Sequence, residues 1–130
     1  MEVTQLNPAD IVKLDVPNYC HGMLVQDASR WLHLSGQVGV APDGTVSPDF
    51  ETQCDRAFQN IGACLRDANM SFDDVVMLRI YLTDRSDLGA LRRIRSEFFG
   101  ERQLSSTLVF VSGLVDPAWK VELEIVAATQ

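Results

Sequence analysis

Apolar residues at helical spacing mark the most regular stretch of this chain. Between Pro48 and Asn69 they recur every three or four positions, and polar residues fill the positions between them. This pattern predicts an amphipathic helix with one buried face. We expect Ser47 to cap the helix and Pro48 to take its first position. The acidic residues Asp49 and Glu51 then lie near the positive end of the helix dipole.

A second amphipathic helix is predicted from Leu88 to Phe99, where apolar residues again follow three- and four-residue steps. Gly100 supplies the expected stop. Three arginines on this helix are expected to form a solvated face and are assigned no site: Arg92, Arg93 and Arg95. The run Val75–Leu82 is rich in β-branched and large apolar residues and is short, which predicts a central strand.

Shorter apolar runs predict the remaining strands: Met23–Val25, Trp31–Leu34, Thr107–Val111 and Trp119–Ala127. The first two flank a polar turn at Asp27–Arg30, so we expect them to form a hairpin. Ala41–Gly44 predicts a further turn, because proline presets φ and the Asp-Gly pair tolerates positive φ. The order ββ-α-β-α-ββ predicts an α+β sandwich, with both helices on one face of a mixed sheet.

The other face of this sheet needs a cover. Alternation along the central strand divides its residues between an apolar face, with Val76, Leu78, Ile80 and Leu82, and a mixed face, with Met77, Arg79, Tyr81 and Thr83. The apolar face suits the helices. Because the strands carry enough apolar residues for both faces, we expect self-association into a homo-oligomer.

Length and charge limit the domain count and the partners. A chain of 130 residues is sufficient for one domain, 1–130. Eleven basic and eighteen acidic residues give a net charge of −7, which argues against a nucleic-acid partner. The longest apolar runs are strand-sized, and no basic, apolar start resembles a signal peptide. We therefore expect a cytoplasmic protein with no membrane span.

The cysteines and histidines do not predict a metal site. Cys54 and Cys64 lie on one predicted helix, roughly 15 Å apart, too far for a disulfide. Cys20 and His21 are adjacent, and neighbours in an extended segment point to opposite faces. We therefore expect reduced thiols, no metal, and no nucleophilic role for Cys20.

Six segments of the chain follow one another in a specific order: Tyr19–Gly22, Leu34–Val38, Ala57–Ile61, Val75–Asp84, Glu97–Phe99 and Val121–Ala127. In this order and spacing they resemble the Rid (YjgF) proteins, which are small trimeric enamine/imine deaminases. The resemblance implies a chorismate-mutase-like (YjgF-type) sandwich. It also implies a homotrimer with three clefts between neighbouring subunits.

The chemistry that the resemblance implies is hydrolysis of a carbon-nitrogen double bond in a small molecule, with release of ammonia and no cofactor. A carboxylate is suited to hold or activate the water. In the family this is the first glutamate of the Glu-x-Glu in the last strand, which matches Glu122. The family's pocket residues match Tyr19, Ser35 and Gly36.

The chain departs from the family at an arginine that clamps the substrate carboxylate. Deaminase members carry a Pro-Ala-Arg-Ser-like run, whereas this chain has Leu104–Thr107, with Ser106 in place of the arginine. Losing such a charge-assisted contact costs about 1.5–3 kcal/mol, or about ten- to a hundredfold in binding. We therefore expect poor activity on 2-aminoacrylate and membership of an arginine-less branch, with Ser106 and Thr107 still lining the substrate site.

Arg79 is expected to point to the mixed face, where it could supply the missing charge from another direction. The alternative is an interface salt bridge with Glu122 or Glu124. Glu122 itself could be a solvated strand end, Glu124 is expected to be structural, and Tyr19 could instead pack at an interface.

Three functions remain open from the sequence. The first is a deaminase-like hydrolase in which Glu122 activates water. The second is a trimer that binds a small metabolite without turnover, and the third is a chaperone-like trimer.

Overall fold

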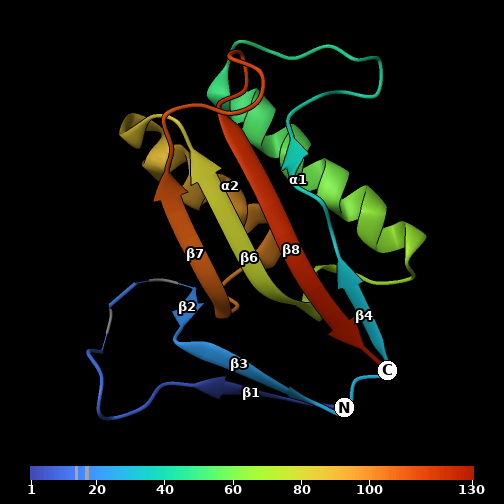
Figure 1. Cartoon of the computed structure of the whole chain (residues 1–130), viewed down its shortest axis with the longest axis vertical. Coiled ribbons are helices and arrows are strands. Elements are labelled where there is room, and N and C mark those ends of the chain that lie inside the picture. The colour runs from blue at the N-terminus through green and yellow to red at the C-terminus, as the bar shows by residue number, and fades with distance from the viewer. Residues whose placement is uncertain (14, 17) are drawn as a thin grey trace.

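The computed structural model describes residues 1–13, 15–16 and 18–130 (Figure 1). The strands in this part of the chain are β1 Glu2–Leu6, β2 Tyr19–Cys20, β3 Gly22–Gln26, β4 Arg30–His33, β5 Gln37–Val38, β6 Val75–Leu82, β7 Leu104–Phe110 and β8 Val121–Thr129. The helices are α1 Phe50–Asp67 and α2 Leu88–Phe99, with 3-10 turns η1 Phe72–Asp74 and η2 Arg85–Asp87.

The main sheet is mixed. Its described strands follow the order β2-β7-β6-β8-β4, and β5 also pairs with β8. The central strand β6 is parallel to β7 and antiparallel to β8. Both helices cover the same face of this sheet, and the opposite face carries no helix in the described part of the chain (Figure 1). The predicted α+β sandwich is therefore confirmed.

The predicted hairpin between the strands near residues 23 and 34 is wrong. β3 pairs with β1 in a separate two-stranded sheet, whereas β4 pairs with β8 at the edge of the main sheet. Asp27 between them has a φ of 58°. The chain turns there and continues into the main sheet instead of folding back on β3. The pairing depends on β1 and β8, which are distant in sequence.

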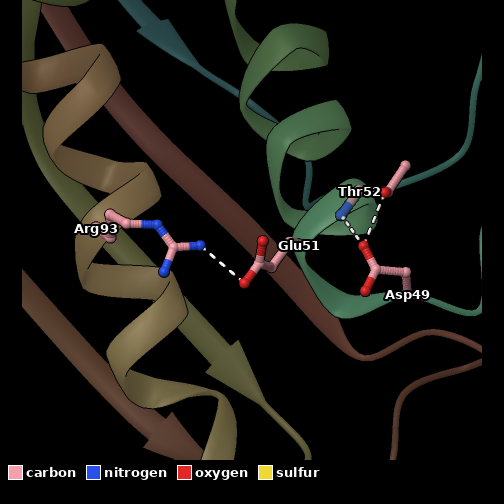
Figure 2. A network of polar contacts seen from close by, with 4 residues as sticks. All are labelled: Asp49, Glu51, Thr52 and Arg93. Atoms are coloured by element: carbon pink, nitrogen blue, oxygen red, sulfur yellow. Dashed lines mark hydrogen bonds and ion pairs between the residues drawn. The ribbon is translucent and has the colours of Figure 1, made fainter.

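Helix α1 begins two residues later than predicted, because Asp49 is the cap (Figure 2). Its carboxylate accepts hydrogen bonds from the Thr52 N–H, at 2.9 Å, and from the Thr52 hydroxyl, at 2.8 Å. These bonds lower the pKa of Asp49. The Ser47 hydroxyl instead accepts from the Asp49 N–H, at 3.1 Å, and so supports the turn before the helix.

Helix α2 has the predicted limits, and Gly100 follows it with a φ of 62°. The core lies between the two helices and the sheet, where Phe58 of α1 stacks on Phe98 of α2 with centroids 5.0 Å apart. One prediction for β6 is wrong: a bulge at the start of this strand places Val75 in the helix-side core instead of Val76. From Leu78 onward the alternation of β6 follows the prediction.

Candidate functional site

Glu122 lies on β8, on the face of the sheet that the helices leave open. In β8 it alternates with Val121 and Leu123, which are both buried in the helix-side core. Its carboxylate lies against Gly36: a methyl group added to that glycine would come within 2.1 Å of Oε2 of Glu122. Gly36 therefore allows the loop before β5 to approach the carboxylate. The structure thus brings Glu122 and Gly36 together. Ser35, which comes directly before Gly36 in the same loop, is exposed.

A second carboxylate, Glu124, lies two residues further along the same face. It accepts a hydrogen bond from the Tyr81 hydroxyl. This bond is the main cause that raises the pKa of Tyr81, because the ionised phenol would lose it and face a negative charge. Part of the hydrogen-bonding capacity of Glu124 is thus used within the sheet, which agrees with a structural role.

Arg79 and Thr107 are exposed on this open face, one row of the sheet away from Glu122. Arg79 pairs in register with Glu124 on one side and with Thr107 on the other. Among residues 1–13, 15–16 and 18–130, one ion pair lies within 4.0 Å, and it joins Arg93 to Glu51 (Figure 2). Arg79 therefore forms no salt bridge with another described residue of its own chain. Its positive charge remains available to a ligand or to another protomer.

Ser106 lies on the opposite face of the sheet from Glu122. Its partner in register is Leu78, which is buried beneath the helices. Ser106 lines a pocket of about 480 Å³ between the β7 edge of the sheet and α2, together with Tyr19, Leu108 and Arg95. This is the α2-side pocket. Tyr19 reaches it because β2 runs parallel to β7, with Tyr19 in register with Leu104.

The Tyr19 hydroxyl contacts His21, which in turn contacts the backbone of Val12. The hydroxyl lies 3.3 Å from Nδ1 of His21, whose Nε2 is 2.9 Å from the carbonyl oxygen of Val12. A carbonyl only accepts, so Nε2 carries a proton and the Nδ1 of the neutral imidazole accepts from the Tyr19 hydroxyl. The phenol oxygen then offers its lone pairs to a ligand as a hydrogen-bond acceptor.

The predicted site residues thus form two groups within one protomer. Glu122, Gly36 and Arg79 belong to the open face, whereas Tyr19 and Ser106 belong to the α2-side pocket. The sheet separates the two groups, so they do not meet around one small molecule in a single chain.

Known proteins share this architecture and sequence over nearly the whole chain. Residues 6–129 match the family model described as Endoribonuclease L-PSP. A RutC family protein of Pyrococcus abyssi is 32% identical over 100 residues, which make up 75% of this chain and 78% of that protein. YyfB of Yersinia pestis, a protein of unknown function in the Rid family, has a crystal structure with a TM-score of 0.83 and 27% identity, covering 98% of this chain and 99% of that one. The chain belongs to the Rid (YjgF) family.

A further Rid relative has a name that points to chemistry. TdcF of Escherichia coli, named provisionally as a reactive intermediate deaminase, is 27% identical over 78 residues, which cover 59% of this chain and 60% of that protein. The predicted family is therefore confirmed, with a deaminase-like relative in it. Membership of an arginine-less branch of the Rid family stays a prediction.

One arginine of α2 was placed wrongly from the sequence. Arg95 was expected on a solvated helix face, but it is only 8% exposed and lines the α2-side pocket. The signal was present in the spacing, because Arg95 lies four residues after Leu91 and four before Phe99, and both are buried. Because Arg95 is charged, it was expected on the solvated face instead of on the buried stripe of α2.

The cysteines of this Rid protein are free thiols. Cys20 is buried and donates to the carbonyl of Gly22 at 3.3 Å, and burial raises its pKa. Burial also raises the pKa of Cys54 to about 12. Within the described residues no group of three or more His, Cys, Asp or Glu side chains is arranged to hold a metal ion. No helix in the same part of the chain has the length and apolar character needed to cross a membrane.

Proposed function

We propose that this Rid protein is a small-molecule hydrolase that adds water to the carbon-nitrogen double bond of an imine and releases ammonia. One imine and one water molecule give one ketone or aldehyde and one ammonia, so the reaction balances without a cofactor. Enamine substrates would first tautomerise to the imine. Glu122 is the residue that handles the water.

The separation of the two groups of site residues carries this proposal. In one protomer the sheet lies between the Glu122 group and the α2-side pocket. A second copy that packs its open face beside the β7 edge of the first would bring Glu122 of one chain to Tyr19 and Ser106 of the other. A closed ring of such head-to-tail contacts gives one cleft for each subunit, which fits a homotrimer.

Glu122 is suited to activate the water because its carboxylate lies against the backbone of Gly36 and is not fully buried. The residue is partly exposed on the open face. A carboxylate in this position accepts a proton from water as the oxygen attacks the imine carbon. Glu122 returns that proton to the imine nitrogen, which gives a carbinolamine. The carbinolamine hydroxyl then gives up its proton to the nitrogen, and ammonia leaves as the carbonyl forms.

Ser106, in place of an arginine, limits the imines that the protein can hydrolyse efficiently. It supplies no positive charge from β7, so a substrate as small as 2-aminoacrylate lacks the bidentate contact that a guanidinium would provide. The imine is either uncharged or turned so that its anionic group meets another cation. Arg79, which is exposed beside Thr107 on the open face, is one such cation.

The family description names an endoribonuclease, but the charge of this chain speaks against RNA as its substrate. A net charge of −7 disfavours a polyanion, because neutralisation of phosphates dominates nucleic-acid binding. A ribonuclease assay on single-stranded RNA belongs in the test as a second arm.

The experiment is ammonia release from enzymatically generated imines. L-amino acid oxidase supplies 2-imino acids, and a flavin-dependent amine oxidase supplies uncharged imines. The proposal predicts that the wild-type protein hydrolyses at least one imine faster than Glu122→Gln does. The oligomeric state and the melting temperature of the two proteins should be the same. No acceleration with any imine, together with RNA cleavage or with tight binding of a metabolite, would overturn it.

A further inference from the structure

The α2-side pocket gathers positive charge, and its lining has no acidic residue among the described positions. Arg92, Arg93 and Arg95 line it. Arg93 is neutralised outside the pocket by Glu51, at 2.8 Å. Arg92 and Arg95 therefore leave uncompensated charge in a chain whose net charge is −7. Such a pocket favours an anion.

Arg95 has an unused donor in this pocket. Its Nη2 donates to the carbonyl oxygen of Asn18 at 2.7 Å, but its buried Nε has no hydrogen-bond partner in the described part of the chain. A guanidinium has five N–H donors in a planar fork that matches a carboxylate. Burial lowers the pKa of Arg95, and the charge of Arg92 lowers it further. A bound anion beside the guanidinium would offset both effects.

We infer that Arg95, with Arg92 beside it, binds the carboxylate of the substrate from helix α2, in place of the contact that Ser106 cannot make from β7. This inference rests on the proposed function and narrows its substrate class. Ser106 and Arg95 line the same pocket, so Arg95 can reach from the helix the space that a side chain at position 106 faces from the strand.

The rest of the pocket indicates what else the substrate carries. Val16 and Leu108 contribute apolar surface to a cavity of about 480 Å³, with the buried Ile80 and Leu91 beneath it, and this size accommodates a small organic molecule. The substrate class is a 2-imino acid with an apolar side chain. Its carboxylate points toward α2, and hydrolysis yields the matching 2-oxo acid and ammonia.

Binding of a product analogue tests the inference without turnover. The probes are 4-methyl-2-oxopentanoate and its neutral amide, titrated calorimetrically into the full-length protein in its native oligomeric state. The wild type should bind the acid about ten- to a hundredfold more tightly than the amide. Arg95→Gln should abolish this preference, and Arg95→Lys should retain part of it because the charge remains.

Two matched variants control for the loss of a positive charge. Arg66→Gln, at an exposed position of α1, should keep the preference for the acid. Arg79→Gln tests whether the arginine on the open face binds the carboxylate instead. If Arg79→Gln loses the preference for the acid and Arg95→Gln keeps it, the inference is overturned. If Arg95→Gln does not fold, a crystal of the wild type with the acid bound decides the matter. A carboxylate away from Arg95, or a neighbouring protomer's acidic residue bound to it, would contradict the inference.

The two proposals fail in different ways. If Arg95 does not bind carboxylates, hydrolysis of uncharged imines and its dependence on Glu122 are unaffected. If imine hydrolysis is absent, the acid-over-amide preference and its loss in Arg95→Gln can still be measured.

Discussion

Replacing Gly36 with alanine should displace the Glu122 carboxylate while leaving the fold intact. The added methyl group would lie 2.1 Å from Oε2 and 2.7 Å from Cδ of Glu122, where carbon and oxygen cannot approach. The carboxylate must move by about 1 Å or more, and a misplacement of that size costs about 100-fold in rate. The φ of Gly36 lies outside the left-handed region, so the alanine adds no backbone strain there.

The assay is kcat/KM for imine hydrolysis, measured beside the melting temperature. We expect a loss of about 100-fold in kcat/KM, equivalent to about 2.7 kcal/mol of transition-state stabilisation, with little change in Tm. A Gly36→Ala variant with wild-type kcat/KM would refute the reasoning, because the position of the carboxylate would then be irrelevant.

Two other glycines serve as controls for this substitution. Gly89 lies exposed in α2 with open space where a methyl group would be added, so Gly89→Ala should keep full activity and raise the stability by about 0.5–1 kcal/mol. A methyl group on Gly39 would lie 2.4 Å from the backbone carbonyl oxygen of Gln53, so Gly39→Ala should lower the Tm along with the activity. Of the three substitutions, only Gly36→Ala should lower the activity without lowering the stability.

Three further predictions concern stability and thiol reactivity. Gln53, which is 1% exposed, bonds to the backbone at Ser47, Ala118 and Lys120, so Gln53→Leu should lower the free energy of unfolding in urea by about 1–3 kcal/mol or more; an unchanged stability would contradict this. The lowered pKa of Asp49 means that its stabilising effect is present above its unfolded pKa of about 3.9 and is lost as the pH falls through its folded pKa. Asp49→Ala should therefore lower the Tm at pH 7, with a smaller difference near pH 2; an equal difference at both pH values would refute the role of the carboxylate. In the native protein at pH 8, iodoacetamide should modify the partly buried Cys64 before Cys54, as peptide mapping would show; the reverse order would contradict the burial of Cys54.

Elements with a strong local pattern could be predicted from the sequence. The limits of α2 follow from its apolar spacing and from Gly100, which has the positive φ that ends the helix. The start of α1 is harder to predict, since Ser47 and Asp49 are both capping residues and only the Thr52 contact decides between them. β2 and β5 have two residues each, too few for any periodicity.

The site could be predicted in part for a related reason. Alternation along β6 correctly gave the face on which Arg79 lies, because that pattern is local. The side on which Ser106 lies depends on the register of β7 with β6, which no local pattern determines. The place of Arg95 in the α2-side pocket depends on the approach of Asn18 and Tyr19 to α2, a contact between residues distant in sequence.

Mixed oligomers test the central claim most directly, because the proposed site needs residues from two chains. Glu122→Gln removes the water-handling group, and Ser106→Trp fills the α2-side pocket, so each variant alone should be inactive in imine hydrolysis. If the cleft lies between subunits of a trimer, co-expressed and randomly mixed chains should recover about a quarter of the wild-type activity, since that share of the interfaces joins two intact halves. Mixed trimers as inactive as either parent would contradict the account.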